Sequence, residues 1–143
     1  MVKKKILIVD DDKHIRLSMV SHLQKGLNVE CIEAENGKEG LAKILVEKPD
    51  LVLLDVNMPV MDGFEVLNKI RRSSIETLKK IPIIMLTGTA EKSVVLHILK
   101  MGISGYLKKP VNSRKAIEQI KQILGPDDDE FSFNLPDVEN LDL

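Results

Sequence analysis

The chain has 143 residues, of which 43% are hydrophobic and 30% are charged. This composition is ordinary for a globular protein and excludes a wholly disordered one. The single cysteine, Cys31, cannot form an internal disulfide, and no apolar run approaches the roughly 20 residues that cross a bilayer. We therefore expect a soluble, cytoplasmic protein with no membrane partner.

The net charge of −1 combines two parts of opposite sign. Residues 126–143 hold seven acidic residues and no lysine or arginine, so this segment has charge −7 and the rest of the chain has charge +6. The lysines of the basic part are scattered, and aromatic residues make up only 3%, which leaves no stacking surface for nucleic acid bases. We expect one domain over residues 1–125, a flexible acidic tail or linker over residues 126–143, and no direct nucleic acid binding.

Three short apolar runs indicate strands that are buried on both faces of a parallel sheet. They cover residues 6–9, 51–54 and 83–86, and each is bounded by Asp, Pro or Gly. Two more mixed runs, residues 29–34 and 105–108, are expected to be edge strands. Apolar residues at helical spacing follow each strand: Ile15, Met19, Val20 and Leu23; Leu41, Ile44 and Leu45; Phe64, Leu67 and Ile70; Val94, Val95, Ile98 and Leu99; and Ala116, Ile117, Ile120 and Leu124. Gly26, Gly102 and Gly125 follow helical patterns, where a left-handed residue often ends a helix.

Strict alternation of strands and helices predicts an α/β fold, a parallel sheet with helices on both faces. Because the three most apolar strands should be central, we predict the doubly wound, flavodoxin-like (βα)5 order 2-1-3-4-5. Ligands of such sheets bind beyond the carboxyl ends of the strands, next to the point where the winding reverses. Here that point lies between the first and third strands.

Chemically active side chains stand at the carboxyl ends of four of these strands. The first strand runs into Asp10 and Asp11, the third ends at Asp55, the fourth ends at Thr87, and the fifth is followed by Lys109. Crowded carboxylates repel one another and favour a bound cation, and hard oxygen ligands suit Mg²⁺, which also shares phosphate oxygens. A carboxylate that faces a metal, a lysine and a hydroxyl can accept a phosphoryl group.

Each of these residues has an ordinary explanation when it is taken alone. Aspartates before a helix often cap it, and we expect Asp12 to cap the first helix and Asp62 the third. Asp55 could be a turn residue, Thr87 a helix cap, and Lys109 a solvated side chain. Because all of them fall on one edge of the predicted sheet, the phosphoryl site is the stronger interpretation.

Four motifs together resemble the receiver domain of two-component response regulators. The resemblance covers residues 3 to about 124, and the motifs are KILIVDDD at residues 5–12, PDLVLLDVNMPVMDG at 49–63, IIMLT at 83–87 and GYLKKP at 105–110. The resemblance implies that Asp55 is the phosphorylated residue. It also implies that Mg²⁺ is bound by Asp11, by Asp55 and by the backbone carbonyl of Asn57, with Asp10 assisting through water.

The same resemblance assigns roles around the acceptor. Lys109 would pair with the phosphoryl oxygens, and the Lys109–Pro110 peptide bond would be cis. Thr87 and Tyr106 match the switch pair of the family, in which the hydroxyl moves toward the phosphoryl group and the ring rotates inward. The surface expected to change lies over residues 88–124.

The function implied by the resemblance is a phosphorylation-dependent signalling switch. Its phosphodonor would be a sensor histidine kinase or a histidine phosphotransfer protein, and its output would pass to a partner or to an effector domain beyond this sequence. Such a chain is not an enzyme, although it assists its own phosphorylation and dephosphorylation.

Two alternatives from other classes share parts of this pattern. A Mg²⁺-dependent phosphohydrolase of the haloacid-dehalogenase type also uses Asp, Thr and Lys, but it requires an Asp-x-Asp motif after the first strand. Asp55 lies after the third strand, and the second acidic position is Asn57. A flavodoxin-like binding protein needs a Ser/Thr/Gly-rich phosphate loop after the first strand, where three aspartates would repel a flavin phosphate.

Overall fold

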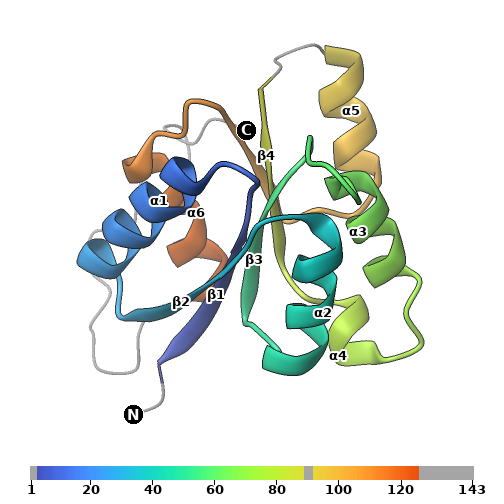
Figure 1. Ribbon diagram of the computed structural model, residues 1–143, viewed down its shortest axis with the longest axis horizontal. Helices are drawn as coiled ribbons and strands as arrows, with labels where there is room; N and C mark the ends of the chain where they lie inside the picture. Colours follow the sequence, from blue (N-terminus) through green and yellow to red (C-terminus); the bar gives the residue numbers. More distant parts are fainter. Residues whose placement is uncertain (1–2, 89–91, 126–143) are drawn as a thin grey trace.

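A computed structural model of the chain describes residues 3–88 and 92–125. Five parallel strands form one sheet in the order β2-β1-β3-β4-β5, so the predicted order and both predicted edge strands are confirmed (Figure 1). The strands are β1 (Lys4–Val9), β2 (Val29–Ala34), β3 (Leu51–Asp55), β4 (Ile83–Thr87) and β5 (Gly105–Lys108).

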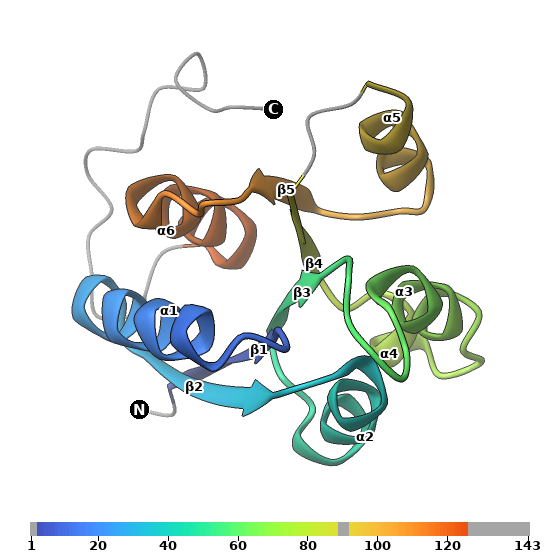
Figure 2. The same ribbon diagram turned by 45° about the horizontal axis from the view of Figure 1, so that its top comes forward.

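Helices cover both faces of this sheet. In the described part they are α1 (Lys13–Gly26), α2 (Gly37–Glu47), α3 (Gly63–Arg71), α4 (Glu76–Lys79), α5 (Lys92–Lys100) and α6 (Ser113–Leu124). Helices α1 and α6 lie together on one face, and α2, α3, α4 and α5 lie on the other, as Figure 2 shows. None of these helices is long and apolar enough to cross a membrane.

The sheet separates two hydrophobic cores. Every residue of β3 and β4 is buried, as are the last four of β1, so the continuous apolar runs do mark central strands. Alternate strand residues face opposite cores: Leu7 packs toward α2 and α3, whereas Ile6 and Ile8 pack toward α1 and α6. This arrangement fixes the carboxyl ends of β1 and β3 side by side, with Val9 opposite Leu54.

Helix ends and surface residues show where local pattern was insufficient. The four-residue α4 was not predicted, because it is too short to show a helical period. Leu45 and Leu99, expected on buried stripes, are 50% and 48% exposed. Gly102 and Gly125 have the predicted positive φ, but Gly26 is the last residue of α1 and does not. A Cβ at Gly26 would lie 2.5 Å from Ile117 Cδ1, so close packing against α6 explains that glycine.

Two predictions fall partly outside the described residues. The acidic segment 126–143 and its boundary with the domain lie there, and so do residues 89–91 of the expected output surface. The domain division therefore stays a prediction.

Candidate functional site

Three carboxylates converge between the carboxyl ends of β1 and β3. Asp10 directly follows β1, Asp11 is the next residue, and Asp55 is the last residue of β3. One oxygen from each of the three lies within 4.8 Å of the others. Asp10 and Asp55 are buried, at 0% and 3% exposed, whereas Asp11 is exposed. Two of the three carboxylates are therefore buried, and the third reaches solvent.

Lys109 completes this group from the end of β5. Its Nζ atom lies 3.0 Å from Asp10 Oδ2 and 3.0 Å from Asp55 Oδ2. The backbone N–H of Lys109 donates to the carbonyl of Thr87 at 2.7 Å, which extends the β4–β5 pairing toward the site. The Lys109–Pro110 peptide bond is cis, as predicted. The ammonium is thus shared between the two buried carboxylates.

Burial and crowding shift the pKa values of Asp55 and Lys109. Burial raises the pKa of Asp55 to about 6, the negative charge of Asp10 adds to this rise, and the hydrogen bonds from Lys109 and the Asn57 backbone oppose it. Burial lowers the pKa of Lys109, but its interactions with Asp10 and Asp55 outweigh burial and raise that pKa above its ordinary value. Lys109 is therefore a fixed positive charge at neutral pH.

The donor atoms suit a small divalent cation. Asp10 Oδ1 accepts a hydrogen bond from the backbone N–H of Asp12 at 2.9 Å, whereas the buried Asp10 Oδ2 receives no directed hydrogen bond from a described residue. Within residues 3–88 and 92–125, the group that compensates the charge of this oxygen is the Lys109 ammonium, 3.0 Å away. Hard carboxylate oxygens that are short of positive partners form an acidic triad of the kind that binds Mg²⁺.

The loop after β3 holds Asp55 in place through close backbone contacts. The N–H of Gly63 donates to the Val56 carbonyl at 2.9 Å, and a Cβ at residue 63 would lie 2.3 Å from the Asp55 carbonyl oxygen. Only glycine permits this approach. Asp62 caps α3 by accepting from the backbone N–H of Glu65, and Asp12 caps α1 in the same way, so both predicted caps are confirmed.

The predicted switch residues lie on the neighbouring strands. Thr87 is 1% exposed at the carboxyl end of β4, on the same edge as the acidic triad. Tyr106 is half-buried in β5 and packs against the core on the α5 side. Its carbonyl accepts a hydrogen bond from Gln119 Nε2 of α6 at 3.1 Å.

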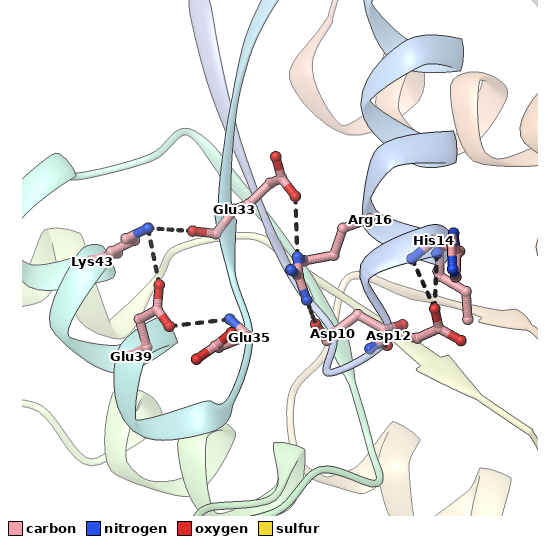
Figure 3. Close-up of polar contacts among 9 residues, drawn as sticks. Asp10, Asp12, His14, Arg16, Glu33, Glu35, Glu39 and Lys43 are labelled. Carbon is pink, nitrogen blue, oxygen red and sulfur yellow. Dashed lines mark hydrogen bonds and ion pairs between the residues drawn. The ribbon is translucent and has the colours of Figure 1, made fainter.

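Two charged residues at the site escaped sequence reasoning. Arg16 of α1 donates through a terminal nitrogen to the carbonyl of Asp10 at 2.7 Å, and its Nε lies 3.0 Å from Glu33 Oε1 of β2 (Figure 3). No local motif joins positions 16 and 33. The available signals were that Arg16 lies six positions after Asp10, in the helix that follows β1, and that Glu33 lies on β2, the strand that pairs with β1.

Comparison with known proteins identifies the class of this fold and site. The family model of the response regulator receiver domain matches residues 6–121. The chain therefore belongs to the response regulator receiver domain family and is a receiver domain of two-component signalling. The predicted family and fold are both confirmed.

Individual relatives agree with this assignment. The chain is 38% identical to the phosphate regulon transcriptional regulatory protein PhoB of Pseudomonas aeruginosa over 133 residues, which cover 91% of this chain and 57% of that protein. It is also 38% identical to a protein-glutamate methylesterase/protein-glutamine glutaminase of Trichodesmium erythraeum, covering 88% of this chain and 36% of that protein.

Solved structures show the same architecture at the scale of the domain. The chemotaxis protein CheY4 of Vibrio cholerae superposes with a TM-score of 0.77 and 33% identity, covering 85% of this chain and 99% of CheY4. A CheY-like receiver domain protein of Methanospirillum hungatei gives a TM-score of 0.76 with 37% identity, covering 86% of this chain and 94% of that protein. By contrast, the chain spans about half the length of the curated regulators that it matches, at 57%, 49% and 48% of three of them.

Proposed function

We propose that this chain is a phosphorylation-dependent switch in which Asp55 accepts a phosphoryl group from a phosphohistidine. The donor would belong to a sensor histidine kinase or a histidine phosphotransfer protein. The observation that carries the proposal is the position of Lys109 Nζ, 3.0 Å from both Asp10 and Asp55, beside a third carboxylate that is open to solvent. This is a buried nucleophile with its charge partner already in place.

In the transfer step, an Asp55 carboxylate oxygen forms a bond to phosphorus while the bond from phosphorus to the donor imidazole nitrogen breaks. The electron pair of that bond stays on the imidazole nitrogen, which then takes up a proton. Lys109 would neutralise the equatorial oxygens, and the Thr87 hydroxyl would donate one hydrogen bond to them. Asp55 with a pKa of about 6 is mainly ionised at neutral pH and can act as the nucleophile.

Asp10, Asp11, Asp55 and the backbone carbonyl of Asn57 would hold Mg²⁺. When it is bound, the ion neutralises charge on the acids and on the transferring group. Asp11 is exposed and has no ion pair among the described residues, so it is available as a ligand. Asp10 and Asp55 would share their negative charge between the ion and Lys109.

The output would follow from the added charge. Phosphorylation brings about −1.5 to −2 charge to a site that faces Lys109, and this biases an equilibrium between two conformations of the neighbouring strands and helices. Thr87 and Tyr106 would couple the site to the surface over residues 88–124. A partner or an attached effector domain would read that surface, since the aligned residues cover only 57% and 49% of two regulators that resemble this chain.

Intact-mass measurement after incubation with phosphoramidate tests the proposal. We expect one phosphoryl adduct on the wild-type chain in the presence of Mg²⁺, none after chelation, and none on Asp55→Asn. Asp12→Asn is the matched control, because Asp12 lies next to the triad, caps α1 and is replaced by another good capping residue. An adduct on Asp55→Asn, or one that ignores Mg²⁺, would contradict the assignment.

A further inference from the structure

The two backbone groups of Asp10 are both connected to strand β2. The N–H of Asp10 donates to the carbonyl of Ala34 at 3.1 Å, which continues the β1–β2 pairing by one residue. The carbonyl of Asp10 accepts from Arg16 at 2.7 Å, and Arg16 in turn contacts Glu33 of β2 at 3.0 Å. The two peptide units that flank the Cα of Asp10 are therefore each tied to the neighbouring strand, the first directly and the second through Arg16.

Arg16 is itself firmly located. Its side chain is only 12% exposed, and its guanidinium contacts both the backbone carbonyl and the Glu33 carboxylate. Glu33 is held in turn, because its carbonyl accepts a hydrogen bond from Lys43 of α2. Lys43 also pairs with Glu39 at 3.1 Å. Figure 3 shows this chain of contacts from α2 through β2 to α1.

The direction of the Asp10 carbonyl matters for the site because the peptide bond is planar. Fixing the carbonyl of residue 10 fixes the plane that contains the N–H of Asp11, and so restricts where the Cα and the side chain of Asp11 can lie. Asp11 is the exposed member of the triad and has no side-chain partner among the described residues to orient it. The orientation of the Asp11 side chain therefore depends on the backbone that precedes it.

We propose that Arg16, anchored by Glu33, is a positioning residue that holds the Asp10–Asp11 peptide in the orientation that directs Asp11 toward the metal. Lysine cannot replace it fully, because a single ammonium lacks the planar fork that contacts the carbonyl and the carboxylate together. This inference rests on the proposed Mg²⁺ site.

The first test measures Mg²⁺ binding by isothermal titration calorimetry, in which MgCl₂ is added to the full chain. We expect Arg16→Lys to weaken Mg²⁺ binding about tenfold, the lower end of what loss of an outer contact costs at a metal site. Glu33→Gln, which keeps an acceptor but loses the charge, should weaken binding less and in the same direction. Arg114→Lys is the matched control, since Arg114 forms an ion pair within α6 and is 87% exposed. Equal Mg²⁺ affinity in the wild type and folded Arg16→Lys would overturn the proposal.

The second test needs no metal and separates this inference from the proposed function. In ¹⁵N-correlated spectra of the metal-free chain, Arg16→Lys should shift the Asp11 amide resonance and speed its hydrogen exchange, while Arg114→Lys leaves both unchanged. An unchanged Asp11 amide would overturn the positioning role even if Mg²⁺ binds. A wild-type chain that binds no Mg²⁺ would instead contradict the proposed function, and the Asp11 amide would still decide the role of Arg16.

Discussion

Two regions of the sheet are held to very different degrees: the acidic end, where the central strands β1 and β3 finish at the three carboxylates, and the α5–β5 end, at one edge of the sheet. At the acidic end, the strands are buried, and Asp10 is fixed through its N–H, its carbonyl and Oδ1. At the α5–β5 end, Ile98 is the one buried residue of α5, and β5 has only four residues. The two leucines of α5, Leu96 and Leu99, are 46% and 48% exposed.

This difference matches the work that each end would do. Transfer of a phosphoryl group requires the nucleophile and the cation to be in position before the donor arrives. Several contacts at the acidic end therefore hold the same groups. An output surface must exist in two conformations of similar free energy, and elements that move are drawn from those with few buried apolar contacts. Substitutions in each region can show whether the acidic end is rigid and the α5–β5 end adaptable.

The largest effect should come from adding one methyl group at Gly63, against the backbone of Asp55. In Gly63→Ala the new Cβ would lie 2.3 Å from the Asp55 carbonyl oxygen, so α3 or the end of β3 must move. We expect urea unfolding to show a loss of about 3 kcal/mol, at the upper end of what overpacking costs. Gly88→Ala is the control, because a Cβ there meets no atom of the described residues within 4 Å. Equal stability of the two variants would show that the acidic end is not rigid.

Asp55 itself should destabilise the fold at neutral pH. Because the pKa of Asp55 is raised from 3.8 to about 6, the folded state keeps a proton that the unfolded state has released, and its contribution to stability falls as pH rises through this window. Above pH 6 the cost is at most about 3 kcal/mol, from about 1.4 kcal/mol per pKa unit. Asp55→Asn should therefore be more stable than the wild type at pH 7.5 without Mg²⁺, by urea unfolding.

The pH dependence of that difference is the decisive feature. The gain in stability of Asp55→Asn should shrink as pH falls from 6 toward 4. Over this range the folded wild type is protonated at Asp55, and the unfolded wild type increasingly takes up the same proton. Added Mg²⁺ should stabilise the wild type more than the variant, through binding to the folded state. A difference that does not change with pH would show that Asp55 is not held in the environment described.

Sequence reasoning was most successful where one strand or one loop determines the outcome. Continuous apolar runs located the central strands, and their carboxyl ends located Asp10, Asp55 and Lys109, because the ends of parallel strands must share one edge. Asp12 and Asp62 were recognisable as caps since capping depends on residues two or three positions away.

Contacts between distant segments could not be obtained in this way. Arg16 meets Glu33 across 17 positions, and Arg71 donates to the carbonyl of Gly102 across 31, and neither pair forms a sequence pattern. Arg71 also donates to the carbonyls of Lys79 and Ile81, so this one side chain connects α3, α4 and the loop before β5. Such contacts depend on packing distances that only the folded chain defines.

The smallest effect should appear where α6 meets β5. Gln119 Nε2 donates to the Tyr106 carbonyl, but the buried Gln119 Oε1 receives no hydrogen bond from a described residue. Gln119→Met removes the unsatisfied oxygen. It also removes the hydrogen bond from Nε2, which leaves the Tyr106 carbonyl without that donor. We expect a loss of about 1 kcal/mol in urea unfolding, with faster amide exchange in β5. Gln122→Met, at an exposed position of the same helix, should change neither quantity.

The sign of that change is informative about the α5–β5 end. A net loss means that the bond from Gln119 contributes more than the unsatisfied oxygen costs, so α6 restrains the strand that carries Tyr106. A gain in stability would mean that the unpaired oxygen dominates and that β5 carries strain in this conformation. If amide exchange in β1 then changed as much as in β5, the two ends would behave as one cooperative unit, and the contrast between a rigid site and an adaptable surface would be wrong.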